Sequence, residues 1–263
     1  MQAEPAAPPC TANSFATPPA SAGTPAGART DPHQTEPAAG RNQTGAGPSE
    51  HLKRIRNMFD KNRLFCFKGA VFDLDGTLVD SEPVHLLVWQ DVCRKYQLPV
   101  MTLDYIQHFG GMSTISLCEM MCEENHRRDL DYMAVANEKS EIYRQKYMDT
   151  VPLNPYIASL MKEAHARGLK TAVATGSRLP ETEYLLKKFG LMPAVDAIVT
   201  SDQVPKAKPA PDTYLISAQR LGLDPRFCVA FEDTDLGLRG IRAAGMTAVK
   251  VAKDKIISDF ITP

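Results

Sequence analysis

Residues 69–80 of the chain read GAVFDLDGTLVD. The apolar run that ends at Phe72 predicts a buried strand, and the acidic residues and glycine that follow predict its end. Asp73 and Asp75 are two residues apart, so their side chains point to the same side of an extended segment. Two carboxylates this close repel each other unless a shared proton or a cation offsets them. A hard divalent cation such as Mg²⁺, which prefers oxygen ligands, is therefore expected at the carboxyl end of this strand.

A pair of carboxylates in this position can transfer a phosphoryl group. One carboxylate attacks phosphorus and forms an aspartyl phosphate, while the other protonates the leaving oxygen and later activates water. We assign Asp73 as the nucleophile and Asp75 as the general acid and base. Acidic residues at strand ends also serve as turn or cap residues, so the pair alone does not decide between the two interpretations.

The rest of the chain predicts a parallel sheet with a helical insertion. From residue 154 on, strand patterns alternate with helix patterns, which is typical of parallel strands joined by right-handed crossovers. Residues 82–150 show helical periodicity without a strand signal. Because the strand at 70–73 belongs to the sheet by its chemistry, this helical block is predicted to be inserted directly over the strand ends. The predicted strands are 170–175, 197–200, 228–231 and 247–251, and the predicted helices lie at 154–168, before 190, at 211–222 and near 236–244.

Two later segments carry polar groups to the same edge of the predicted sheet. Thr175 follows the second strand, and with Gly176 and Ser177 it offers hydroxyl and backbone N–H groups that can hold a phosphoryl oxygen. Lys208 precedes a helix start flanked by prolines and can neutralise the charge of a phosphate and of the nucleophile. A hydroxyl at a strand end is more often a helix cap, and the nearby Lys206 competes with Lys208 for this role.

A second acidic cluster follows the strand at 228–231. Acidic side chains at a strand edge are costly unless they hold a cation. We therefore expect Asp233, with Glu232 close by, to complete the metal site. Asp235 is expected to cap the next helix.

In their order, these four elements resemble the motifs of the haloacid dehalogenase superfamily, which are DxDGT, a Thr or Ser after the second strand, a lysine before a helix, and a late acidic pair. The resemblance covers residues 67–251. It implies an α/β fold with a Rossmann-like parallel sheet core, residues 67–81 and 151–263, and an inserted all-helical cap at 82–150.

The same resemblance implies the chemistry of the site. Aspartyl-phosphate transfer would depend on Mg²⁺ bound by Asp73, by the backbone carbonyl of Asp75 and by Asp233, with Glu232 beside them. Asp75 excludes the dehalogenase branch, which lacks a second acid there. Thr175 and Lys208 would position and neutralise the transferring group.

Within the superfamily, the segment DSEPVH at 80–85, with Trp89, KPAPD at 208–212 and FEDT at 231–234, is similar to the β-phosphoglucomutase-like group. The likeness is nearest to its phosphatases that act on fructose 1-phosphate and 6-phosphogluconate. It implies that His85 and Trp89 of the first cap helix face the substrate, with His85 also able to contact Asp75. Packing inside the cap is an equal alternative for Trp89. Lys139, on the third predicted cap helix at about 133–147, is a candidate contact to a phosphate or carboxylate.

We therefore predict Mg²⁺-dependent hydrolysis of small phosphate monoesters, sugar or polyol phosphates. A phosphomutase is the main alternative. Mutases of the group are expected to carry an arginine after the Gly-Gly turn of the cap, whereas residues 110–114 read GGMST, so water is favoured as the acceptor. A non-enzymatic phosphoacceptor signalling domain is a remote alternative, because such domains have about 120 residues and no helical insertion.

Composition sets further limits. The net charge of −1 gives no indication of nucleic-acid binding, and no apolar run reaches the roughly 18 residues of a membrane span. The six scattered cysteines favour a reducing, cytoplasmic compartment. We expect a monomer that acts on a small phosphorylated metabolite, without a membrane partner.

The first 50 residues differ from the rest of the chain. They are rich in Pro, Ala, Thr, Gly and Ser and almost lack large apolar residues, which predicts a disordered tail. Their hydroxyl-rich, acid-poor composition is also compatible with an organelle presequence. Residues 51–66 alternate basic and apolar residues with the spacing of a short lead-in helix.

Overall fold

The computed structural model describes residues 61–252, 255–257 and 260–263. The predicted tail at 1–50, its alternative as a presequence, and the first ten residues of the predicted lead-in helix lie outside these residues. The described chain begins with the short helix α2 (Lys61–Leu64), which leads directly into the first strand.

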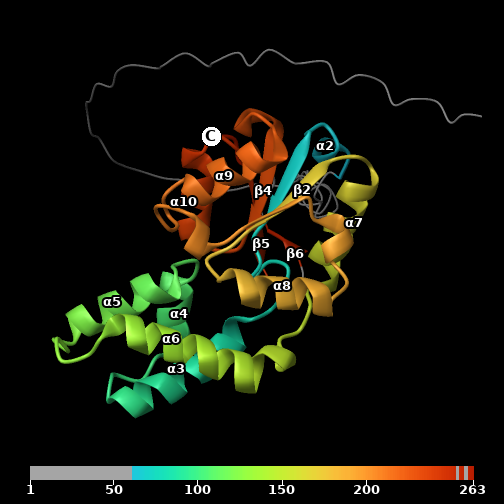
Figure 1. Ribbon diagram of the computed structural model, residues 1–263. Coiled ribbons are helices and arrows are strands. Elements are labelled where there is room, and N and C mark those ends of the chain that lie inside the picture. The colour runs from blue at the N-terminus through green and yellow to red at the C-terminus, as the bar shows by residue number, and fades with distance from the viewer. Residues whose placement is uncertain (1–60, 253–254, 258–259) are drawn as a thin grey trace, which may run out of the picture. The chain divides into compact units, whose positions relative to one another are not determined.

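Six strands of the described chain form one sheet in the order β3-β2-β1-β4-β5-β6 (Figure 1). The first five strands are mutually parallel, and β6 is antiparallel to β5. The predicted parallel α/β sheet is therefore confirmed. The strand β6 was not predicted, because its two residues are too few to show a strand pattern. The strands are β1 (Gly69–Phe72), β2 (Lys170–Ala174), β3 (Ala197–Val199), β4 (Cys228–Glu232), β5 (Thr247–Ala252) and β6 (Lys255–Ile256).

Two apolar cores cover the two faces of the sheet, because successive side chains of each strand point to opposite faces. In β1, Phe72 belongs to the core that includes residues of α7 and α8, whereas Val71 belongs to the core that includes residues of α9 and α10. Strands buried on both faces read as continuous apolar runs, which explains the run before Asp73. The helices are α7 (Pro155–Ala166), α8 (Leu179–Lys188), α9 (Asp212–Leu221) and α10 (Asp235–Ala243).

A helical insertion joins β1 to β2, as predicted. It has an apolar core of its own, which includes Trp89, Cys118 and Val135. Figure 1 shows its helices gathered together as a group separate from the strands. The insertion is the cap of the predicted fold, and its exact bounds, 82–150, stay a prediction. Its elements are α3 (Glu82–Tyr96), α4 (Leu103–Phe109), α5 (Thr114–Glu124), α6 (Tyr132–Ile142) and a π-helix at Tyr143–Tyr147.

Two features of composition also have a structural counterpart. Four cysteines are buried free thiols: Cys93, Cys118, Cys122 and Cys228. None of the helices built from the described residues is long and apolar enough to cross a membrane.

Candidate active site

The register of the sheet places the first acidic residue beside the last acidic pair. Phe72 of β1 lies opposite Phe231 of β4, and their rings stack with centroids 4.7 Å apart. The N–H of Asp73 continues the ladder by donating to the Phe231 carbonyl at 3.0 Å. Asp73 therefore follows β1 directly beside Glu232, the last residue of β4, and both side chains are buried.

The ammonium of Lys208 joins these two carboxylates. Its Nζ lies 2.6 Å from Oδ1 of Asp73 and 2.8 Å from Oε2 of Glu232, and it donates to the Ala174 carbonyl at 3.1 Å. Burial lowers the pKa of Lys208, but the two carboxylates raise it more, so the pKa lies well above its usual value and the lysine stays charged. The competing Lys206 is exposed. The structure therefore brings Lys208, and not Lys206, to the acidic residues.

Glu232 is held from both of its oxygens. The Tyr214 hydroxyl donates to Oε2 at 2.6 Å, and the backbone N–H and hydroxyl of Thr234 donate to Oε1 at 3.1 and 2.7 Å. Burial alone would raise the pKa of Glu232, but the charge and hydrogen bond of Lys208 outweigh it and lower the pKa. Glu232 is therefore an anion with a fixed orientation.

Gly76 and Thr77, which follow the acidic pair of the first motif, both lie against the carboxylate of Asp233. The Thr77 hydroxyl donates to Oδ1 of Asp233 at 3.3 Å. Gly76 has φ +82°, and a Cβ there would lie 2.1 Å from Oδ2 of Asp233. Glycine is thus required at residue 76 both by its backbone conformation and by the approach of this carboxylate.

Asp73, Glu232 and Asp233 form a cluster suited to a divalent cation. Each offers a carboxylate oxygen, and these oxygens lie within 4.8 Å of one another. Burial, and next the charge of Glu232, raise the pKa values of Asp73 and Asp233 well above their usual range. Lys208 pairs with two of the three carboxylates, Asp73 and Glu232, so its single positive charge does not balance the cluster, and the all-oxygen donor set fits a hard cation.

Asp75 lies in a separate cradle of donors. The hydroxyls of Ser81 and Ser177 donate to its two oxygens, each at 2.6 Å, and the Thr175 hydroxyl lies 3.4 Å from Oδ2. Nε2 of His85 lies 3.3 Å from Oδ1. Burial would raise the pKa of Asp75, but these hydrogen bonds, that of His85 first, lower it below its usual value.

The cap contributes His85 and Lys139 to this region. Nζ of Lys139 lies 3.3 Å from Nδ1 of His85 and 3.4 Å from the hydroxyl of Thr114. Burial, and then the charge of Lys139, lower the pKa of His85, and burial lowers the pKa of Lys139 to about 8. A neutral His85 that accepts from Lys139 at Nδ1 donates from Nε2 to Asp75, so the cap residues fix its tautomer.

A cavity of about 90 Å³ lies between these groups. The side chain of Trp89 is part of the apolar core of the cap and also lines this cavity, and its contact with a substrate stays a prediction. Every predicted site residue except four is found in the lining: Asp73, Asp75, His85, Trp89, Lys139, Gly176 and Ser177. Of the four others, Thr175 and Lys208 contact Asp75 and Asp73 directly, and Glu232 and Asp233 belong to the acidic cluster.

The loop between α4 and α5 closes this cavity against the core. A Cβ at Gly176 would lie 3.1 Å from the Gly111 carbonyl oxygen and 3.3 Å from that of Met112. A Cβ at Gly111, which has φ +86°, would lie 2.8 Å from the Thr234 hydroxyl. The absence of a side chain at Gly111 in the cap and at Gly176 in the core thus lets the cap backbone lie close to Gly176 and Thr234.

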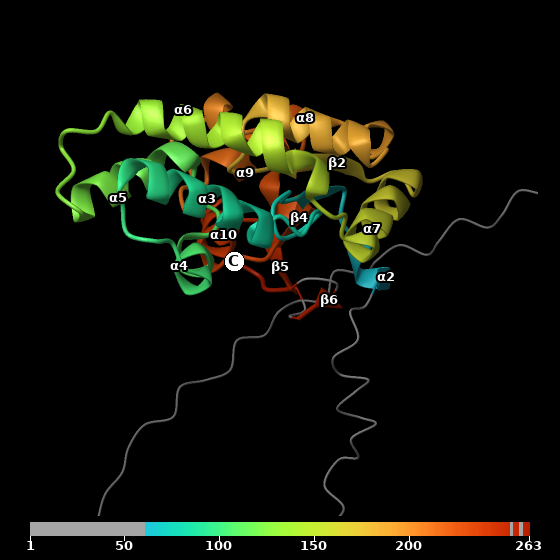
Figure 2. The same ribbon diagram turned by 90° about the horizontal axis from the view of Figure 1, so that it is seen from below.

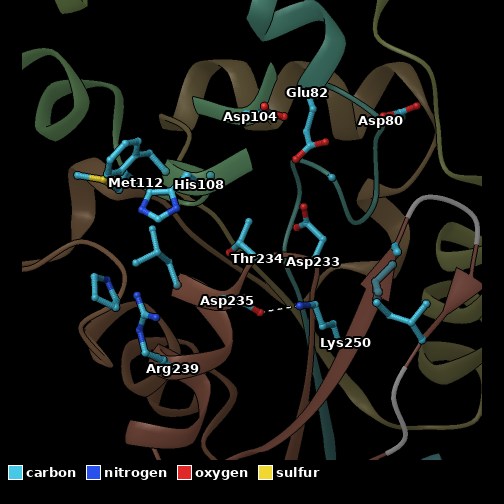
Figure 3. Close-up of a pocket in the computed structure, with 18 residues that line it drawn as sticks. Asp80, Glu82, Asp104, His108, Met112, Asp233, Thr234, Asp235, Arg239 and Lys250 are labelled. Carbon is cyan, nitrogen blue, oxygen red and sulfur yellow. Dashed lines mark hydrogen bonds and ion pairs between the residues drawn. The ribbon is translucent and has the colours of Figure 1, made fainter. Parts of the chain in front are cut away.

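A wider cleft of about 940 Å³ opens on the other side of Asp233 (Figure 3). Figure 3 shows the carboxylates of Glu82 and Asp233 directed toward one another in it. The Asp235 side chain is exposed and forms an ion pair with Lys250 at 2.5 Å. The predicted capping role of Asp235 is therefore wrong, since the hydroxyl of Thr234 accepts from the Gly237 N–H and caps α10 instead.

Sequence reasoning missed several residues of the site. Ser81 is the residue before α3, a position at which a serine commonly caps a helix, but its hydroxyl makes no capping hydrogen bond and donates to Asp75. Tyr214 lies in a predicted helix, where the sequence indicates only an apolar face, but its hydroxyl donates to Glu232. Thr114 lies at the start of a helix capped by Ser113, and its contact to Lys139 has no local signal.

The comparisons with known proteins agree with this geometry. The family model described as haloacid dehalogenase-like hydrolase matches residues 67–245. The fructose-1-phosphate phosphatase YqaB of Escherichia coli strain K12 is 40% identical over 185 residues, which are 70% of this chain and 96% of the relative. The β-phosphoglucomutase of Bacillus subtilis strain 168 is 28% identical over 71% of this chain and 84% of its own.

A solved structure shows the same fold. The crystal structure of β-phosphoglucomutase from Clostridium difficile matches with a TM-score of 0.66 at 23% identity, over 71% of this chain and 85% of that one. The family model spans most of the chain and both acidic motifs, and the E. coli relative matches over nearly its whole length. The chain therefore belongs to the haloacid dehalogenase-like hydrolase family.

Proposed function

We propose that this protein hydrolyses small phosphate monoesters, with sugar or polyol phosphates as substrates and Mg²⁺ as its cation. The observation that carries the proposal is the arrangement of two acidic groups with different surroundings. Asp73 lies in the cluster with Lys208, Glu232 and Asp233, whereas Asp75 is surrounded by hydroxyl and imidazole donors. The likeness to a fructose-1-phosphate phosphatase supports the substrate class.

In the proposed reaction, Asp73 would be kept ionised by Lys208 and the cation, and one of its oxygens attacks phosphorus. Asp75 is ionised in the free enzyme, takes up a proton when the negative charge of the substrate raises its pKa, and gives that proton to the leaving oxygen. The aspartyl phosphate is then hydrolysed by a water that transfers a proton to Asp75. The hydroxyls of Ser81 and Ser177 can donate to the anion of Asp75 and accept from its protonated form, so one cradle serves both steps. Thr175 and the backbone at Gly176 would orient the phosphoryl oxygens, and Lys208 would neutralise charge.

The cation would be held by Asp73, Asp233 and the backbone carbonyl of Asp75, with Glu232 beside them. The shared negative charge and the oxygen donors of the cluster fit Mg²⁺. When bound, the cation supplies charge stabilisation to the phosphoryl oxygens. Glu232 would hold the ammonium of Lys208 in place, and Lys208 would in turn hold the carboxylate of Asp73.

The cap residues would contact the part of the substrate that leaves. His85 and Lys139 offer polar contacts to hydroxyl groups, and Trp89 offers an apolar wall. The enclosing cap would exclude water from the site, which strengthens each electrostatic contact in it. We also propose that the protein is a monomer in a reducing, cytoplasmic compartment, in keeping with the four buried thiols.

The proposal is tested by phosphate release from a panel of sugar, polyol and nucleotide monoesters, with and without Mg²⁺. We expect Mg²⁺-dependent release from fructose 1-phosphate or a related sugar or polyol phosphate, and much slower release from nucleotides. Absence of release from every ester would contradict the proposal.

A phosphomutase is the second candidate, favoured by the 28% identity to a β-phosphoglucomutase. The cap loop at residues 110–114 contains no arginine to hold a second phosphate, so we expect hydrolysis instead. Conversion of glucose 1-phosphate to glucose 6-phosphate without net release of phosphate would decide for the mutase.

Asp233→Asn is expected to raise the Mg²⁺ concentration needed for half-maximal activity at least tenfold, because it removes one of the charged ligands. Asp235→Asn is the matched control, since Asp235 is two residues away, exposed and paired with Lys250. A chelator should abolish the activity of both variants, and added Mg²⁺ should restore it at different concentrations. Equal Mg²⁺ requirements for the two variants would argue against Asp233 as a ligand.

A further inference from the structure

Two buried side-chain polar atoms have no hydrogen-bond partner among the described residues: the Tyr143 hydroxyl and Oε2 of Glu181. Both side chains are almost fully buried, at 3% and 4% exposure. A buried polar atom without a partner costs about 1–3 kcal/mol, and more when it is charged. Such atoms are rare in native proteins and point to a functional role or to a partner acquired in another state.

The two residues lie on opposite sides of the junction between cap and core. Tyr143 begins the π-helix that continues α6 of the cap, and Glu181 lies in the first turn of α8 of the core. Figure 2 shows α8 beside the C-terminal half of α6. Arg144 bridges the junction, with its Nη1 3.3 Å from Oε1 of Glu181. The other oxygen of Glu181 is therefore the free acceptor at this junction, and the Tyr143 hydroxyl is the free donor.

The surroundings of the Tyr143 hydroxyl keep it protonated. Burial raises the pKa of Tyr143 well above its usual value, and the charges of Asp75 and Glu181 raise it further. Tyr143 therefore keeps its proton and can act as a donor. The π-helical turn at this point is a rare form of helix that is often found at functional sites.

Tyr143 also lies directly behind the residues that face Asp75. Its ring packs on the imidazole of His85 with centroids 4.7 Å apart, and Nζ of Lys139 is 5.5 Å from the ring centroid. His85 in turn contacts Asp75 at 3.3 Å. A shift of the Tyr143 ring would therefore move the imidazole of His85, which contacts the proposed acid and base Asp75.

We propose that Tyr143 and Glu181 are a positioning pair that senses the seating of the cap. The cap already contacts the core in this structure, and binding of a substrate would shift Tyr143 and Glu181 until the Tyr143 hydroxyl donates to Oε2 of Glu181. The ring would then fix His85 in the contact that it already makes with Asp75. This inference rests on the proposed function, since it assigns the pair a role in the hydrolysis. It adds to that function a contact made in the substrate-bound enzyme and absent from the free enzyme.

A double-mutant cycle tests the pair in the full-length enzyme, with the sugar phosphate of the panel that is hydrolysed fastest. Tyr143→Phe and Glu181→Gln are each expected to lower kcat about tenfold, the value of one hydrogen bond of roughly 1.4 kcal/mol to a charged group, with little change in KM. The double variant is expected to be no worse than either single one. The Tm of free Tyr143→Phe should equal that of the wild type, because the hydroxyl has no partner to lose.

Tyr147→Phe is the matched control in the same π-helix. The Tyr147 hydroxyl donates to Asp91 at 3.1 Å, so its removal should lower Tm and leave kcat unchanged. Wild-type kinetics for Tyr143→Phe, or independent and additive effects of the two substitutions, would overturn the pair. A loss of Tm in Tyr143→Phe without a loss of kcat would show a merely structural role. A wild type that hydrolyses no ester would instead overturn the proposed function, and the pair's role with it.

Discussion

Asp73→Asn is expected to abolish phosphate release while the fold stays intact. The amide cannot attack phosphorus, and loss of a nucleophile that acts with its neighbours lowers kcat on the order of 10⁴-fold or more. The substitution keeps the size of the side chain and an oxygen that can accept from Lys208. It also removes one of three mutually repelling carboxylates, so the Tm should not fall.

The measurement is phosphate release from the best substrate of the panel, together with thermal unfolding of the same preparation. An unfolded variant would be seen directly in the unfolding curve. An Asp73→Asn variant that is folded and still turns over at a rate near that of the wild type would show that the nucleophile lies elsewhere.

Lys208→Met is expected to impair stability and activity together. The substitution keeps the apolar stem but leaves Asp73 and Glu232 without the ammonium that lies between them. Removal of one partner of a buried ion pair costs about 3–5 kcal/mol, and for a chain of this size that lowers the Tm by roughly 6–20 °C. Loss of the positive charge beside the transferring group should lower kcat by about 10²–10³-fold.

The control is Lys206→Met, which changes an exposed lysine two residues away in the same segment. Surface substitutions of this kind usually change stability by less than about 0.5 kcal/mol, so both Tm and kcat should remain those of the wild type. If the two variants behaved alike, the buried contact of Lys208 would have no energetic or catalytic role.

The position of the acidic cluster followed from local sequence because parallel strands end at one edge. The apolar run before Asp73 and the one before Glu232 each identify a strand, and strands of one parallel sheet deliver the residues after them to the same side. The pairing of Phe72 with Phe231 then fixes the register. The regular spacing of apolar residues was likewise enough to predict the helices of the core and the helical insertion between β1 and β2, although α4 of the insertion was not predicted.

The polar partners within the site could not be predicted in the same way. Ser81 has the position of a helix cap, but its backbone is helical (φ −92°, ψ −12°) and not extended as in most caps, and its hydroxyl donates to the buried anion of Asp75. At α10, Thr234 has the extended backbone of a cap and accepts from the Gly237 N–H, whereas Asp235 is already inside the helix and pairs with Lys250. The requirement for glycine at residue 76 comes from Asp233, a residue 157 positions later, and has no local signal.

The central claim is that Asp73 carries the phosphoryl group during turnover. The most direct test is to mix the enzyme with its best substrate and Mg²⁺, quench within the first turnover, and reduce the acyl phosphate with borohydride. Mass spectrometry of the peptides then locates the reduced residue. The account predicts reduction of Asp73 alone, and none in Asp73→Asn. Reduction at Asp75 or Asp233, or an unmodified Asp73 in an enzyme that is turning over, would contradict it.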